Sequence, residues 1–189
     1  MSAKPSSGAA GTPRPPSRSR PMAREISQAV RQLASRMGVR LGLRKRRASF
    51  SWDGRSIYAF GRSDSDVIHD LAHLQCSEPH RRLLPEWGLG SDPGRVREAG
   101  YDAPRVGVIV DADEEESAAS LLGILWEREL GLDYMATFYL HGWTASAGTV
   151  DAVLRKDAAA TRLRRWRLIR RNRPLVAFRP ESVKEPSDA

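Results

Sequence analysis

Four consecutive acidic residues, followed by a run of small and apolar ones, constrain the fold of this chain more than any other feature. The run reads "DEEESAASLLGILWEREL" and begins at Asp113. Acidic residues are favoured in the first turn of a helix, where the helix dipole is positive, and Gly131 can end the helix. Residues 117–120 are Ser or Ala. We therefore expect a helix whose small residues let a second helix approach closely.

The second helix is predicted at "DVIHDLAHLQC", from about Asp66 to Cys76. Its apolar residues recur at helical spacing, and Ser63 and Asp64 are suitable N-caps. We expect these two helices to share a core. The residues predicted to be buried in it are Val67, Ile68, Leu71, Leu121, Leu122, Ile124 and Leu125.

Two histidines on the second helix are candidate metal ligands. His69 and His73 are four residues apart, so they lie on one face and their ring nitrogens can converge on one ion. A third ligand has to come from elsewhere, and the acids that open the other helix are the candidates. Two histidines and one carboxylate leave coordination positions open, as in zinc hydrolases and non-haem iron oxygenases. The alternative is a surface pair of histidines beside ordinary N-terminal helix charge.

The residues near the two histidines limit the reactions that a metal site here could catalyse. Asp70 is the candidate catalytic residue. It occupies the position of the general base in the H-E-x-x-H metalloprotease motif, but it is one methylene shorter, which counts against peptidase chemistry. His80 follows His73 by seven residues instead of the six of the metzincin pattern, so we do not expect it to be a ligand. Cys76, the one cysteine, is expected to be a small buried side chain. A single cysteine excludes an internal disulfide and suits a cytoplasmic protein.

The remaining patterns predict an α+β fold that is mostly helical. Asp53-Gly54 between aromatic and apolar residues predicts a β-hairpin, and alternating valines predict a short strand at 106–110. Two further helices are expected at about 150–160 and 161–171. The predicted organisation is a disordered basic tail (1–21), an amphipathic basic helix (22–47), a metal-binding domain (48–176) and a flexible C-terminal tail (177–189).

Charge is distributed unevenly along the chain. Residues 1–47 contain twelve Lys and Arg and one acid, and residues 155–173 contain nine and one. The part between them carries eighteen acids and eight basic residues. The Arg-rich flanks predict contact with RNA or DNA, with solvated helix faces as the alternative. No membrane partner is expected, because no run approaches the roughly 20 apolar residues of a membrane span and no signal peptide is visible.

Residues 64–130 resemble the elongation factor P hydroxylase family. The resemblance consists of His69-Asp-Leu-Ala-His73, then Arg81-Arg82-Leu83, then Glu86-Trp-Gly88. The family has an H-E-x-A-H motif, a following R-R-x-L, an acidic-aromatic-Gly turn and a carboxylate at the start of a later helix. That carboxylate maps best to Glu115, with Glu116 as the close alternative.

The resemblance implies a small zincin-like unit and a metal-dependent, monooxygenase-like activity. One divalent metal is expected, with iron favoured and zinc possible, and the implied substrate is a modified lysine on a translation factor or another protein. The chain departs from the family at Asp70, which replaces a Glu, in the turn Trp87-Gly88-Leu89, and at Leu-Leu-Gly in the later helix, where the family has Leu-Glu-Trp. These departures indicate a distant member or paralogue, whose substrate the sequence does not identify. A zincin-like metallohydrolase, or a nucleic-acid-binding or ribosome-associated protein with a structural metal, remains the alternative.

Overall fold

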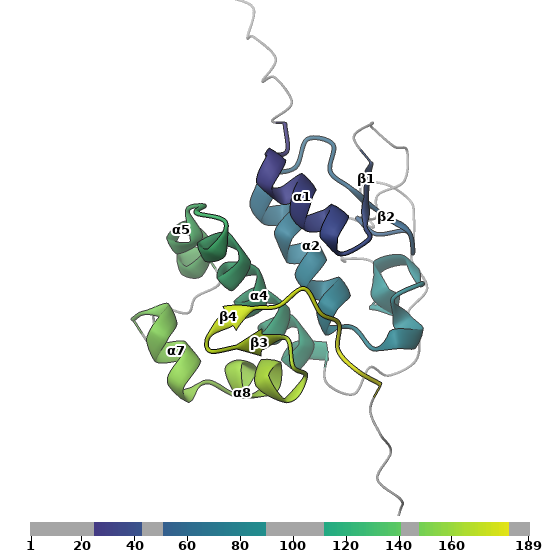
Figure 1. Cartoon of the computed structure of the whole chain (residues 1–189). Coiled ribbons are helices and arrows are strands. Elements are labelled where there is room, and N and C mark those ends of the chain that lie inside the picture. The colour runs from purple at the N-terminus through teal and green to yellow at the C-terminus, as the bar shows by residue number, and fades with distance from the viewer. Residues whose placement is uncertain (1–24, 43–50, 90–111, 141–147, 182–189) are drawn as a thin grey trace, which may run out of the picture.

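The computed structural model describes residues 25–42, 51–89, 112–140 and 148–181. Within them the chain is mostly helical with four short strands, as expected (Figure 1). The predicted strand at 106–110 and the predicted disordered tail at 1–21 lie outside the described residues. Among the helices that are described, none is both long enough and apolar enough to cross a membrane.

Helices α2 (Asp64–Cys76) and α4 (Ala112–Glu129) pack against each other at the centre of the molecule (Figure 1). Ser63 begins α2 with a capping box, in which its hydroxyl accepts from the Asp66 N–H and the Asp66 carboxylate accepts from the Ser63 N–H. A Cβ added to Gly123 would lie 3.7 Å from the His69 Cα, so the two helix backbones approach closely. All seven residues predicted to join these helices are fully buried.

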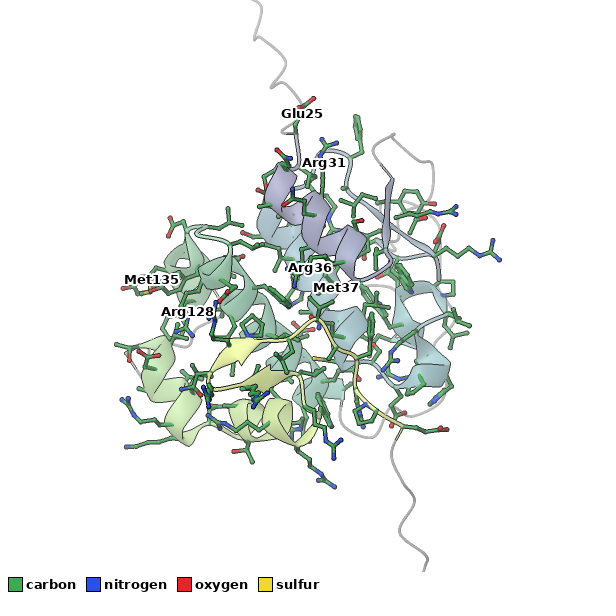
Figure 2. The ribbon with its side chains drawn as sticks, in the orientation of Figure 1. Glu25, Arg31, Arg36, Met37, Arg128 and Met135 are labelled. Carbon is green, nitrogen blue, oxygen red and sulfur yellow. The ribbon has the colours of Figure 1, made fainter. Side chains whose placement is uncertain are left out.

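Helix α1 (Gln28–Arg36) covers α2 and is shorter than the helix predicted within 22–47. Its outer side carries the exposed Arg31 and Arg36, whereas Met37 at its end is buried (Figure 2). The helix ends at Gly38, whose φ of +72° is easily adopted by glycine. Strand β1 (Arg40–Gly42) follows directly.

The turn of the hairpin predicted around Asp53-Gly54 is present: the Tyr58 N–H donates to the Ser51 carbonyl at 2.8 Å and the Asp53 N–H to the Ser56 carbonyl at 3.3 Å. Strand β2 (Ser56–Tyr58) pairs in parallel with β1, and the turn itself retains one antiparallel bridge, between Trp52 and Ile57. Residues 48–50 of the predicted hairpin lie outside the described residues. Glu86 accepts hydrogen bonds from the Ser51 and Trp52 backbone N–H groups, so a contact distant in sequence also holds the segment before the turn.

The C-terminal part wraps around α4. It contains α5 (Tyr134–Leu140), α7 (Val150–Lys156), α8 (Ala158–Arg165) and the antiparallel strands β3 (Ile169–Arg170) and β4 (Arg173–Pro174). Asp157 separates α7 from α8 by ending one helix and capping the next. The predicted helix at 161–171 therefore stops at Arg165, and the β3–β4 hairpin beyond it lies over α4 and α8 (Figure 1).

The segment after β4 is bound to the end of α2. The Gln75 side-chain amide donates to the carbonyls of Leu175 (2.7 Å) and Ala177 (2.6 Å), and its oxygen accepts from the Trp126 indole (2.8 Å). The Arg179 N–H donates to the Gln75 carbonyl at 2.8 Å. The beginning of the predicted flexible tail at 177–189 is thus ordered, because its backbone is hydrogen-bonded to a buried side chain.

Candidate metal centre

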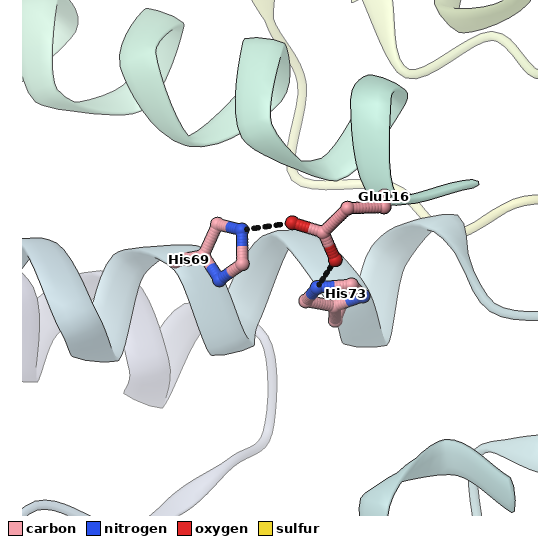
Figure 3. Close-up of side chains that lie close together, drawn as sticks. All are labelled: His69, His73 and Glu116. Carbon is pink, nitrogen blue, oxygen red and sulfur yellow. Dashed lines mark hydrogen bonds and ion pairs between the residues drawn. The ribbon is translucent and has the colours of Figure 1, made fainter. Parts of the chain in front are cut away.

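Two of the predicted ligands on α2 meet a carboxylate from the first turns of α4 (Figure 3). The His69 Nε2 lies 3.1 Å from one Glu116 oxygen, and the His73 Nε2 lies 2.9 Å from the other. One ligand atom from each of these residues lies within 4.8 Å of both others. Ser120, one turn further along α4, donates to Glu116 at 3.2 Å and approaches the His69 Nε2 at 3.4 Å.

The donor set fits a divalent transition metal. Metal–ligand bonds at such a site are about 2.0–2.2 Å long, and one ligand atom from each of the three residues lies within 4.8 Å of the others, close enough for all three to contact one ion. Imidazole nitrogens and a carboxylate oxygen suit iron or zinc. The His73 side chain is 6 % exposed, that of His69 27 % and that of Glu116 52 %, so the group is closed on one side and open on the other.

The three side chains also influence each other's protonation. Hydrogen bonds from His69 and His73 hold the pKa of Glu116 far below its usual range, despite partial burial. Burial alone would lower the pKa of His73. The hydrogen bond and negative charge of Glu116 outweigh that burial and raise it. Without a metal, the group is therefore held together as a charge-assisted hydrogen-bond network.

Glu115, which the resemblance favours as the carboxylate ligand, does not face the histidines. Successive residues on a helix point about 100° apart, so only one of these two glutamates can be directed at α2's histidine face. Glu115 is buried and forms an ion pair with Arg81, with Arg179 3.8 Å away and the Ser77 hydroxyl at 3.3 Å. The structure therefore assigns the histidine-facing position to Glu116 and a structural ion pair to Glu115.

Asp70, predicted as the catalytic residue, is engaged elsewhere. It is buried and forms an ion pair with Arg62, and its carboxylate is outside the histidine–glutamate group. Burial would lower the pKa of Arg62, but the Asp70 charge outweighs it and raises that pKa. His80 is exposed and 3.8 Å from Glu78, apart from the group as predicted. Cys76 is buried as predicted, and burial raises the pKa of its thiol well above the usual value.

An aromatic side chain holds the inner histidine in place. The His73 ring stacks on Trp87, with centroids 5.1 Å apart and planes 22° from parallel. Its Nδ1 is buried and has no hydrogen-bond partner among the residues that the structure describes, and stacking takes the place of the acceptor that usually orients a metal-binding histidine. Trp87 itself stacks on Trp52, at a centroid distance of 6.3 Å.

The backbone that presents Trp87 is strained. Glu86 and Trp87 lie in the 3₁₀ turn η2 (Pro85–Gly88), with positive φ angles of 48° and 53°. Residues with a Cβ adopt such angles at a cost and persist there only where surrounding contacts fix them. Here the Glu86 carboxylate is fixed by Ser51 and Trp52, and the Trp87 carbonyl accepts from Arg81 at 3.0 Å.

Arg81 is in the 3₁₀ turn η1 (Pro79–Arg81). Its guanidinium is hydrogen-bonded both to the Glu115 carboxylate and to the Trp87 carbonyl, so it links Glu115 to the residue that stacks on His73. Sequence reasoning included Arg81 and Trp87 in a motif without assigning them these contacts. It did not identify Arg62, Gln75 or Arg179, which belong to none of the motifs, and the partners of Gln75 and Arg179 are also distant in the chain. In comparisons with known proteins, neither a family model, nor a curated protein, nor a solved structure matches this chain.

Proposed function

We propose that the protein is a metal-dependent enzyme in which His69, His73 and Glu116 hold one divalent ion. The observation that carries the proposal is the convergence of these three donors from two helices whose backbones pack closely. A set of two histidines and one carboxylate occupies one side of an ion and leaves positions for substrate on the other. The half-exposed Glu116 marks the side from which a substrate can approach.

Iron is the favoured ion, with zinc as the alternative, and oxidation is the favoured chemistry. A zincin peptidase needs a carboxylate after the first histidine to act on water at the metal. Asp70 occupies that position but is paired with Arg62. Ferrous iron bound at such a site supplies oxygen-dependent oxidation, and that chemistry requires no base at Asp70. The pairing of Asp70 therefore supports an oxygenase over a zincin-like metallohydrolase.

The implied substrate is a protein side chain. The resemblance to the elongation factor P hydroxylases suggests hydroxylation of a modified lysine on a translation factor or a related protein, by a small zincin-like unit. In this chain Trp87 orients the His73 ring and Arg81 anchors Trp87. Both belong to the motifs that carry the resemblance, which gives those motifs a physical role in holding the site.

Metal stoichiometry tests the binding site. Purified full-length protein is dialysed anaerobically against Fe²⁺, and separately against Zn²⁺, and its metal content is measured. We expect about one ion per chain, and loss of binding in His69→Ala, His73→Ala and Glu116→Gln. The matched controls are His80→Ala and Glu114→Gln, which alter an exposed histidine and an acid outside the group. Equal metal content in all five variants would refute the site.

The variant Asp70→Asn distinguishes oxygen-dependent oxidation from hydrolysis. The variant keeps the side chain's shape, so iron loading should survive, and so should oxygen consumption with a lysine-containing translation-factor substrate. A hydrolase that used Asp70 as its base would instead lose activity by orders of magnitude while retaining its metal. Peptide hydrolysis by the zinc form that disappears in Asp70→Asn would exclude the oxidative proposal.

A further inference from the structure

Helix α8 ends in a motif that normally contains glycine. The Arg167 N–H donates to the Arg164 carbonyl at 3.0 Å, and the Leu168 N–H donates to the Leu163 carbonyl at 2.9 Å. These are the two hydrogen bonds of a Schellman motif, in which the residue after the C-cap has a left-handed backbone. Arg167 is that residue, with φ of +60°. Its Cβ makes this conformation unfavourable relative to glycine.

The chain uses glycine where other helices end in the same way. Helix α1 ends with Gly38 donating to Ser35 and Val39 donating to Ala34, and α4 ends with the corresponding bonds from Gly131 and Leu132. Both glycines have φ of +72°. Arg167 is therefore an exception to a pattern that the same molecule follows elsewhere.

A second arginine is strained in the same region. Arg171 and Asn172 form the two-residue turn between β3 and β4, with φ of 50° and 62°. Positive φ at both central residues defines the type I′ turn, in which Asn, Asp and Gly are preferred. Asn172 fits this preference and Arg171 does not. Two arginines thus occupy backbone positions that their side chains disfavour, which indicates that the side chains serve another purpose.

The surface around these residues is strongly basic. Residues 150–173 contain nine Lys and Arg and two acids. One acid, Asp151, pairs with Arg128, and the other, Asp157, caps α8. Five arginines from α8 to the hairpin are exposed and form no ion pair with any acid in the described part of the chain. Arg164 donates to the Leu154 carbonyl and to the Asn172 side chain, and the other four are Arg165, Arg167, Arg170 and Arg171. We call these four residues the basic hairpin surface.

We infer that the basic hairpin surface binds the phosphate backbone of a nucleic-acid duplex. Arginine donates several hydrogen bonds in a fixed geometry that matches phosphate. Binding to bases by stacking would require a free aromatic ring nearby. Trp166, between these arginines in sequence, is half-buried, with the Arg179 guanidinium 4.3 Å and that of Arg162 5.9 Å from its ring centre. The surface therefore suits phosphates and not unstacked bases, and this inference is independent of the metal site.

Replacing the strained arginines separates binding from folding. In the double variant Arg167→Gly/Arg171→Asn, both new residues suit the local backbone, so the midpoint of thermal unfolding should stay the same or rise by about 3 °C. Binding of the full-length protein to 20-base-pair RNA and DNA duplexes is measured by fluorescence anisotropy across salt concentrations. The variant should bind several-fold more weakly, and its log–log salt dependence should be shallower by about 2.

The matched control is Arg31→Gln/Arg55→Gln, which removes two exposed arginines outside the hairpin (Figure 2 places Arg31 on α1). It should retain the salt dependence of the unmodified protein. The inference is overturned if neither duplex binds at low salt, if the hairpin variant and the control lose affinity equally, or if single strands bind more tightly than duplexes. Binding to phosphatidylserine vesicles alone would also overturn it, by assigning the surface to a membrane.

Discussion

Two adjacent glutamates on α4 have opposite roles, and substitution should separate them. Glu115→Gln removes the charge that compensates the buried Arg81, so we expect the free energy of unfolding to fall by about 3–5 kcal/mol. The folded fraction should still bind one metal ion. Glu116→Gln should abolish metal binding and change stability far less, because its carboxylate is half-exposed. Urea denaturation and metal analysis of both variants test this, and metal loss in Glu115→Gln alone would reverse the assignment.

The pH dependence of stability follows from the pairing of His73 with Glu116. The pKa of His73 is raised in the folded state. Its contribution to the free energy of unfolding is therefore present below the ordinary histidine pKa of 6.5 and is lost as the pH rises through the raised pKa. The pKa of Glu116 is lowered, so its contribution is present above the ordinary glutamate value of 4.5 and lost as pH falls through the lowered one. The metal-free pair should therefore stabilise the fold most between those two ordinary values.

With a bound metal, the free energy of unfolding should rise with pH on the alkaline side, where that of the metal-free protein falls. Metal ligands have to be deprotonated, so metal-dependent stabilisation grows as pH rises. Urea denaturation from pH 4 to 9, with chelator and with saturating Zn²⁺, checks both signs. Glu116→Gln is the control. In the presence of chelator, the free energy of unfolding of this variant should fall much less at alkaline pH than that of the unmodified protein. An unchanged decline in that variant would show that another group titrates.

At the scale of elements, Gln75 joins α2 to the segment that follows β4. Gln75→Leu removes the hydrogen bonds to the Trp126 N–H and to the carbonyls of Leu175 and Ala177, and of these three groups the Leu175 carbonyl keeps a second donor, the Ala177 N–H at 2.9 Å. An unsatisfied buried group costs about 1–3 kcal/mol, and two of the three are only partly shielded, so we expect a total loss of about 2–4 kcal/mol. Gln32→Leu, at an exposed position on α1, should change stability by less than about 0.5 kcal/mol. Equal urea midpoints for the two variants would contradict this role.

At the scale of the whole molecule, the sequence predicted what depends on local periodicity. The helices that carry the histidines and the acids, and the core they share, follow from spacing along each helix. The choice between Glu115 and Glu116 depends on how α4 is rotated relative to α2, which only their packing determines. The turn at Gly54 was also predictable from local signals, whereas the parallel pairing of β2 with β1 and the contact of Glu86 with the preceding segment, more than thirty residues away, were not. Asp70 matched a motif position, and its pairing with Arg62 could not be read from that motif.

The attachment of residues 175–179 to Gln75 also affects the order in which the molecule is completed during synthesis. Hydrogen bonds from Gln75 reach carbonyls 100 and 102 positions later, and Arg179 lies 3.8 Å from Glu115, 64 positions before it in the chain. A nascent chain that has emerged only as far as α4 contains both histidines and Glu116. It still lacks residues 175–179, which are hydrogen-bonded to Gln75 at the end of α2. Because these contacts are non-local, the end of α2 gains its hydrogen-bonded cover only after residues 175–179 have been synthesised, later than the three metal-site residues.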